Sequence, residues 1–246
     1  MKENKIYNVT KGCRWVLKMN KSNENLEKIK GGLIVSCQAL EDEPLHSSYI
    51  MARMAYAAWE GGACGIRANS PKDIKEIKKT VPLPIIGLYK QVYSDSKIYI
   101  TPSISEVDRL IEAGTDIIAM DATNRLRPNG ITLQQFFKDV KSRYPDMLFM
   151  ADCSDFKEAE FAQSLGFALV GTTLCGYTED TKDVKLPAYE LLKEMAGKLY
   201  IPVIAEGGIW TPEQLKTAMN TGAYAAVVGT AITRPRDITR RFINAL

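Results

Sequence analysis

Two ionisable side chains stand where short apolar runs end. Lys90 closes the run Pro84-Ile-Ile-Gly-Leu-Tyr-Lys90, and Glu206 closes the run Val203-Ile-Ala-Glu206. A free lysine has a pKa of about 10.4, but partial burial or a neighbouring cation such as Arg67 lowers it. A lysine tuned in this way can move a proton beside a carbonyl or form a Schiff base. Glu206 can hold or relay protons, although an ionised carboxylate touching the lysine would raise the lysine pKa.

Further polar residues end other apolar runs of the chain. They are Gln38, Arg67, Asp121, Asp152 and the pair Thr172-Thr173. A single charged residue at such a place is usually solvated or held in a structural ion pair. The convergence of several strand ends favours one shared site instead.

Two glycine-containing breaks near the C-terminus have the pattern of an anion site. Gly207-Gly208 precedes a helical segment at 211–220, and Gly229-Thr230 precedes another at 235–245. Glycine lets a bound group approach the backbone, and a helix N-terminus offers unpaired N–H donors. A barrel of eight parallel strands often holds a phosphate at such loops near its end. The pair therefore predicts binding of a phosphorylated small molecule.

The elements that must carry these residues alternate regularly between strand and helix. The predicted strands are 32–38, 64–69, 84–90, 116–122, 148–153, 168–174, 203–206 and 225–229. The predicted helices are 48–59, 71–79, 103–113, 133–143, 189–197, 211–220 and 235–245. The pattern predicts an α/β protein, a single (β/α)8 TIM barrel over residues 31–246, and the chain length of 246 suits that fold. No glycine-rich nucleotide-binding motif follows the first strand.

Residues 1–30 differ from the rest of the chain. They hold eight Lys and Arg against three Asp and Glu, whereas the whole chain carries a net charge of +3. We interpret them as a short basic N-terminal extension, either solvated or forming a short helix that closes the bottom of the barrel. A contact with an acidic partner is the alternative. The remaining body is mildly acidic, so we expect no nucleic-acid binding.

Cysteine and histidine usage excludes several classes of protein. The five cysteines are scattered and odd in number, which indicates reduced thiols in a cytoplasmic protein, and those near strands one, two and five suit the core. His46 is the only histidine, so a zinc site built on two histidines is excluded. We interpret His46 as a loop residue, with ligand contact as the alternative. No apolar run is long enough for a membrane span.

Several motifs resemble those of the N-acetylmannosamine-6-phosphate 2-epimerases. The resemblance covers residues 32–246 and lies in Leu33–Leu40, Asp42–Ser48, Gly65–Ala68, Gly87–Lys90, Tyr99–Pro102, Met120–Thr123, Arg127-Pro128, Met150–Asp152, Gly171–Thr178, Glu206-Gly207 and Val228–Pro235. It implies a (β/α)8 enzyme of bacterial sialic acid breakdown that interconverts N-acetylmannosamine 6-phosphate and N-acetylglucosamine 6-phosphate. It also implies that the reaction needs no metal and no cofactor.

The resemblance assigns roles to particular residues. Lys90 falls on the catalytic lysine and Glu206 on its partner. The substrate-binding positions fall on Gln38, Arg67 and Asp152, and we expect Thr173 to join them. The phosphate-binding positions are Gly207, Gly208, Gly229, Thr230 and Arg234. The chain departs from the family pattern at Gln91, where many relatives have arginine, and at Thr230, where they have glycine.

Two other functions remain open at this point. Lys90 would also serve a Schiff-base aldolase acting on a phosphosugar, and the same barrel without turnover would be a sugar-phosphate-binding protein. Assembly as a homodimer and closure of the polar loop 175–185 as a lid are left open as well.

Overall fold

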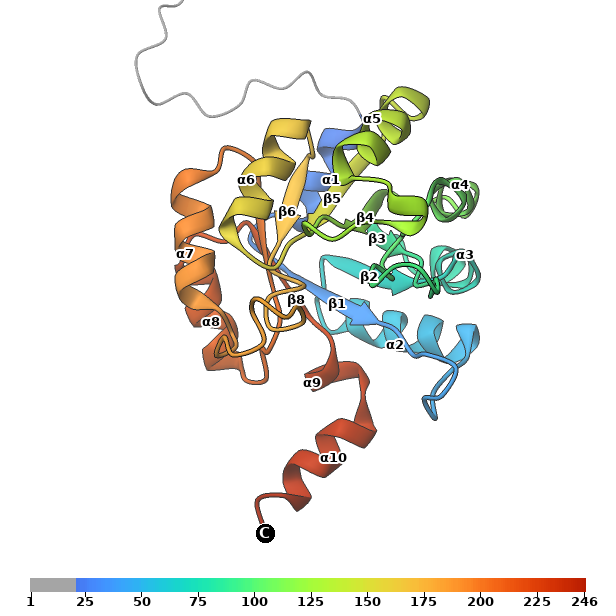
Figure 1. The fold of residues 1–246 in the computed structure, drawn as a ribbon. Helices are drawn as coiled ribbons and strands as arrows, with labels where there is room; N and C mark the ends of the chain where they lie inside the picture. The colour runs from blue at the N-terminus through green and yellow to red at the C-terminus, as the bar shows by residue number, and fades with distance from the viewer. Residues whose placement is uncertain (1–20) are drawn as a thin grey trace, which may run out of the picture.

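The eight predicted strands form a closed parallel barrel in the computed structural model, which describes residues 21–246 (Figure 1). In chain order they are β1 Leu33–Cys37, β2 Gly65–Asn69, β3 Ile85–Leu88, β4 Ile117–Asp121, β5 Leu148–Asp152, β6 Leu169–Gly171, β7 Val203–Glu206 and β8 Ala225–Val228. Each strand pairs with the next in sequence, and β8 pairs with β1. The predicted (β/α)8 fold is confirmed.

Helices surround the barrel between the strands. They are α2 Ser48–Glu60, α3 Pro71–Thr80, α4 Ile104–Glu112, α5 Leu133–Arg143, α6 Phe156–Leu165, α7 Tyr189–Lys198, α8 Pro212–Asn220 and α10 Pro235–Ile243. The helices that were predicted are confirmed within two residues at each end. Three elements were missing from the prediction: α6, the 3₁₀ turn η1 Pro128–Gly130, and α9 Thr230–Thr233. A further short helix, α1 Lys21–Ile29, lies within the basic N-terminal extension.

Two predicted strands are too long. β6 ends at Gly171, because from Thr172 onward the chain turns and the Leu174 amide donates to the Cys153 carbonyl at 3.1 Å. β3 ends at Leu88, and Lys90 pairs with Ile100 in an isolated antiparallel bridge. In both places the apolar pattern continues past the point where the backbone leaves the barrel wall.

Side-chain oxygens cap most of the helices, which explains where they begin. Ser47 accepts from the Ile50 amide at the start of α2. Ser103 with Glu106 forms a reciprocal capping box at α4, and Thr211 with Gln214 forms another at α8. Such caps satisfy N–H groups that the helix itself leaves unpaired.

The core has two parts, as alternate strand residues point inward and outward. The outer part lies between strands and helices. The inner part fills the lower barrel with residues that include Ile34, Ile86, Ile117, Met150 and Ile204. Inward positions nearer the strand ends are polar instead, so the barrel interior changes from apolar to charged along its axis.

α1 closes the N-terminal end of the barrel. Its Ile29 is fully buried with the inner core, and the Tyr224 hydroxyl donates to the Leu26 carbonyl at 3.0 Å. The helical option for the basic extension therefore describes residues 21–29, while residues 1–20 lie outside the described part.

α10 behaves differently from the other long helices. Figure 1 shows it extending away from the barrel beyond α9, and none of its residues is buried. Phe242 and Ile243 expose 72% and 61% of their surface. Of the helices in the described part, none is long and apolar enough to pass through a bilayer.

Candidate active site

Arg67 is the centre of a buried ionic cluster at the C-terminal end of the barrel. It comes from β2, is 1% exposed, and donates to both carboxylate oxygens of Asp152 on β5, at 3.2 and 2.5 Å. Its Nη1 also lies 3.2 Å from Oε2 of Glu206 on β7. Paired charges of this kind tolerate burial because each neutralises the other. Three predicted site residues from three strands are thus in direct contact.

Thr173 completes this cluster. Its hydroxyl lies 2.7 Å from Oδ1 of Asp152 and 3.2 Å from Oε2 of Glu206. A hydroxyl carries one proton, so it donates to one carboxylate at a time. Burial, and then Asp152, raise the pKa of Glu206 above its ordinary value, while Arg67 opposes that rise. Glu206 is therefore a carboxyl group suited to exchanging a proton.

Lys90 lies just beyond β3, at the mouth of the barrel. Its amide donates to Oδ1 of Asn69 at 2.9 Å, and its ammonium group makes no ion pair within residues 21–246. Burial, with Arg67 and Arg234 nearby, lowers the pKa of Lys90 to about 8, and Glu206 and Glu43 only partly offset this. The sequence-based expectation that burial and Arg67 tune this lysine downward is met by this environment.

Gln38 follows β1 at the same end of the barrel and is buried. Its Nε2 donates to the Ser36 hydroxyl at 2.9 Å, whereas its Oε1 has no partner in the described part of the chain. An unpaired buried acceptor is costly and is normally satisfied by water or ligand. Gln38 can thus accept a hydrogen bond from a hydroxyl or amide of a bound molecule.

The two glycine loops present free backbone donors. Gly207 and Gly208 have φ of +117° and +69°, a region that favours glycine. In the described chain their N–H groups have no protein acceptor, and neither do those of Thr230 and Ala231. The loops follow adjacent, paired strands β7 and β8, so their donors are available together to an anion.

Arg234 lies behind the second loop and is held by a residue that the sequence reasoning did not assign to the site. Glu43, from the β1–α2 loop, accepts from Arg234 Nε at 3.1 Å and also pairs with Arg236 at 3.5 Å. The only hint of this role for Glu43 in the sequence was its place in the Asp42–Ser48 motif. Glu43 and Arg234 are 191 residues apart, so no local pattern could connect them.

Other candidates lie elsewhere. Asp121 accepts from Thr123 and Arg125 instead of facing the lysine. His46 lies in the loop before α2, and its Nδ1 is 3.0 Å from the Ala39 carbonyl oxygen of the same loop. Cys37 and Cys153 are buried in the core as predicted, whereas Cys64 is only partly buried against it, and burial raises the pKa of all three thiols. Among residues 21–246, no His, Cys, Asp and Glu side chains group as metal ligands.

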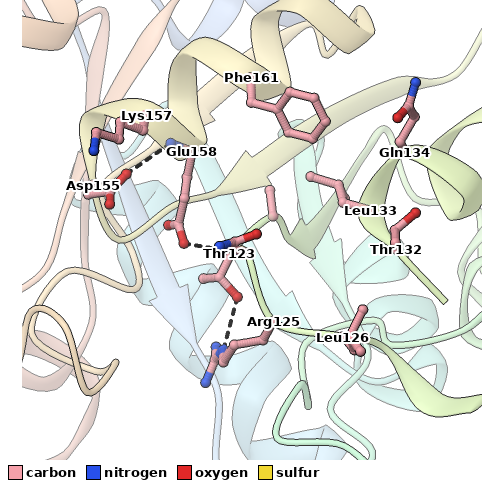
Figure 2. Close-up of a pocket in the computed structure, with 12 residues that line it drawn as sticks. Thr123, Arg125, Leu126, Thr132, Leu133, Gln134, Asp155, Lys157, Glu158 and Phe161 are labelled. Carbon is pink, nitrogen blue, oxygen red and sulfur yellow. Dashed lines mark hydrogen bonds between the residues drawn. The ribbon is translucent and has the colours of Figure 1, made fainter. Parts of the chain in front are cut away.

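A cavity of about 410 Å³ lies beside the barrel mouth, between the β4–α5 loop, α5 and α6 (Figure 2). Thr123, Arg125, Glu158 and Phe161 line it, but Lys90 and Glu206 do not. The buried ionic cluster of Arg67, Asp152 and Glu206 does not line this cavity either, and it is the stronger candidate site because ionisable groups with altered pKa values converge there.

A closed parallel barrel with a buried lysine and a buried carboxyl group at its mouth, beside free main-chain N–H donors, is typical of the (β/α)8 enzymes that act on phosphorylated small molecules. Comparison with known proteins narrows this class. Residues 51–246 match a family described as "Putative N-acetylmannosamine-6-phosphate epimerase". The chain belongs to the N-acetylmannosamine-6-phosphate 2-epimerase family.

Individual members of the family are similar to this chain over nearly its whole length. A protein of Caldanaerobacter subterraneus subsp. tengcongensis, named "Putative N-acetylmannosamine-6-phosphate 2-epimerase", is 55% identical over 89% of this chain and 92% of its own. A protein of the same name from Listeria welshimeri is 51% identical over 92% and 96%. The solved N-acetylmannosamine-6-phosphate 2-epimerase of Clostridium perfringens is 52% identical, with a TM-score of 0.86 over 90% of this chain and 96% of that one.

Proposed function

We propose that this protein interconverts N-acetylmannosamine 6-phosphate and N-acetylglucosamine 6-phosphate, a step of sialic acid catabolism. The observation that carries the proposal is Lys90, whose pKa is lowered to about 8 in a barrel mouth shared with Glu206. A base with a pKa near neutrality is efficient in general acid–base catalysis.

The two sugars differ only in the configuration at C2. In the open-chain form this carbon lies beside the C1 aldehyde, so removal of its proton gives an enolate with the charge on O1. Lys90 takes the proton, and return of a proton to the opposite face of C2 inverts the centre. Glu206 assists by proton transfer, ring opening or orientation. This chemistry needs general acid–base groups and enolate stabilisation, and therefore no metal or cofactor.

Polar groups around the lysine hold the sugar. We assign the hydroxyl and acetamido groups to Gln38, Arg67, Asp152 and Thr173, with the unpaired Gln38 oxygen as one acceptor. We assign the phosphate to the backbone of Gly207, Gly208, Gly229 and Thr230, with Arg234 beside them. Binding the phosphate away from C2 supplies energy that fixes the reacting geometry.

The test is conversion of N-acetylmannosamine 6-phosphate in a coupled assay with a chelator present. We expect turnover in the native protein and a loss of roughly three orders of magnitude or more in Lys90→Ala, as for other general acid–base residues. Lys75→Ala, at an exposed lysine of α3, is the matched control and should keep full activity. Epimerisation that persists in folded Lys90→Ala would end the proposal.

Isotope exchange examines the same step independently. Turnover in D₂O should place deuterium at C2 of the product. A product without deuterium indicates internal return of the proton or a route without deprotonation, and Lys90→Ala then separates the two. Trapping of a substrate on Lys90 by borohydride would favour a Schiff-base aldolase instead. Stabilisation by the sugar phosphate without any conversion would favour a binding protein.

We also propose that the protein is a cytoplasmic homodimer. Cys37, Cys64, Cys153 and Cys175 are free, which suits a reducing compartment. The support for a dimer is α10, which carries the exposed Phe242 and Ile243 away from the barrel. A second copy would cover this apolar surface.

A further inference from the structure

The segment Tyr99–Pro102 lies between the ends of β3 and β4. These strands share only the register pairs Ile86↔Ile117 and Gly87↔Ile118. Beyond them the strands separate. On one side the Gln91 amide donates to the Tyr99 carbonyl at 2.9 Å, and on the other the Asp121 amide donates to the Ile100 carbonyl at 3.1 Å. The segment is thus a short insertion at the barrel mouth, joined to Lys90 by the isolated antiparallel bridge Lys90↔Ile100.

Every polar group of Thr101, a residue of this insertion, makes a hydrogen bond. It is fully buried, and its N–H donates to the Tyr89 carbonyl at 2.9 Å. Its hydroxyl accepts from the Tyr89 amide at 3.2 Å and donates to the Ala119 carbonyl at 2.7 Å. Tyr89 directly precedes Lys90, so Thr101 fixes both main-chain groups of the residue before the lysine.

Arg127 holds Thr101 from behind. Its Nη1 donates to the carbonyls of Thr101 and Pro102 at 2.9 and 3.1 Å, and its Nη2 donates to the Asp121 carbonyl. The guanidinium group also lies 3.9 Å from the centre of the Phe136 ring. Three carbonyls from two segments therefore share one buried, planar donor.

The backbone of Thr101 is strained, which indicates that this arrangement is imposed by its surroundings. Its φ is +48°, in the left-handed region that a β-branched residue rarely adopts. Such a conformation persists only when neighbouring contacts determine it, and it occurs often at functional sites. Here the contacts are the four hydrogen bonds of Thr101 to Tyr89, Ala119 and Arg127.

We propose that Thr101, held by Arg127, is a positioning residue that sets where the Lys90 amine lies in the barrel mouth. The inference rests on the proposed role of Lys90. The lysine backbone is anchored on its other side by Asn69, at 2.9 Å, and its ammonium group has no ion pair within residues 21–246. The hydrogen bonds that hold the backbone at Tyr89 and Lys90 therefore set how far the amine lies from each neighbouring charge.

Those charges come from four separate parts of the fold. Arg67 of β2 and Arg234 after α9 disfavour the protonated amine, whereas Glu206 of β7 and Glu43 of the β1–α2 loop favour it. Burial adds to the effect of the arginines. A lysine that moves outward gains solvent and leaves Arg67, so its amine should hold its proton up to higher pH.

Thr101→Val tests the inference, because valine has the shape and branching of threonine but lacks the hydroxyl. We expect kcat to fall about tenfold to a hundredfold with KM within about threefold, since small misplacements of a reacting group cost this much. The acidic limb of the kcat/KM profile should move to higher pH. Thr101→Ser, which keeps the hydroxyl, should restore both values.

Trace labelling of Lys90 with acetic anhydride, followed across pH by mass spectrometry, reports the amine without any turnover. Its midpoint should rise in Thr101→Val and stay in place in Thr115→Val. Thr115, two residues before β4, is a matched control because it is also buried and its hydroxyl donates to the Leu110 carbonyl at 2.8 Å.

Several results would overturn the positioning role. They are an unchanged labelling midpoint in folded Thr101→Val, a kcat within twofold of the native value, or a Thr101→Ser variant that behaves as the valine variant does. If Thr101→Val does not fold, Arg127→Lys replaces it, since lysine lacks the planar fork, and the same rise in midpoint is required. If the native protein does not epimerise its substrate, the proposed function fails, but the labelling midpoints still decide the role of Thr101.

Discussion

At the scale of single residues, the pKa values of Lys90 and Glu206, the proposed reacting groups, follow from their neighbours. Lys90 faces two arginines and two glutamates from four parts of the fold, and burial tips the balance toward the neutral amine. Glu206 is pushed toward its protonated form by burial and Asp152. The pair is thus brought from opposite directions toward neutral pH, which suits the exchange of a proton between acid and base.

The activity should therefore rise with pH through the titration of Lys90. Only the neutral amine can remove the C2 proton, so below a pH of about 8 we expect kcat/KM to fall about tenfold for each pH unit. The measurement is kcat/KM from pH 6 to 9 at constant ionic strength. A flat profile over this range would mean that Lys90 is not the base.

The positions of Lys90, Arg67, Asp152 and Glu206 could be predicted because each follows an apolar run, and parallel strands end on the same face of a barrel. Their pairing could not be predicted, because Arg67 contacts Asp152 and Glu206 through folding and not through spacing. The same holds for Glu43 and Arg234. Thr101 was visible only as part of a motif, since its strained backbone depends on Arg127.

At the scale of elements, the loops after β7 and β8 form the proposed phosphate site. The Gly207-Gly208 turn packs against the β6–α7 loop, and a Cβ at Gly208 would lie 3.2 Å from the Leu186 carbonyl carbon. Short elements such as α9 were missed because Thr230–Thr233 is rich in β-branched residues, which suit a strand better than a helix. The long helices were found because their caps and periodicity agree.

Gly208→Ala should weaken both folding and phosphate binding. A left-handed backbone costs a residue with a Cβ about 1–2 kcal/mol, and contact with Leu186 adds to this cost. Gly130→Ala is the control, because Gly130 has a φ of +70° but open space around it. Urea unfolding should show a larger loss for Gly208→Ala, and only this variant should raise KM. Equal losses and equal KM values would contradict the packing argument.

At the scale of the whole molecule, the chain forms a closed barrel, and its last long helix, α10, extends away from the barrel instead of packing on it. Ile238 and Phe242 lie one turn apart on α10, and no residue of that helix is buried. The barrel was predicted from the alternation of strands and helices. The direction of α10 was not predicted, because its amphipathic pattern is the same whether the helix packs on its own barrel or on another molecule.

Phe242→Asp should shift the protein toward monomers, because a charge would replace an apolar group in the interface of the proposed dimer. Arg240→Asp, on the opposite side of α10, introduces the same carboxylate as a control. Light scattering after size-exclusion chromatography measures the mass of each variant. A native protein that is monomeric at micromolar concentration would refute the dimer, as would a Phe242→Asp variant that stays dimeric.

The buried cluster around Arg67 divides the barrel by charge. Its arginine comes from β2, in the first four strands, while its two carboxylates come from β5 and β7, in the last four. If the chain were cut after β4, each fragment would carry inside it an ion whose counterpart belongs to the other. Each half would then hold a buried charge without its counterion and would be poorly stable alone, so the ionic cluster also links the two halves of the barrel.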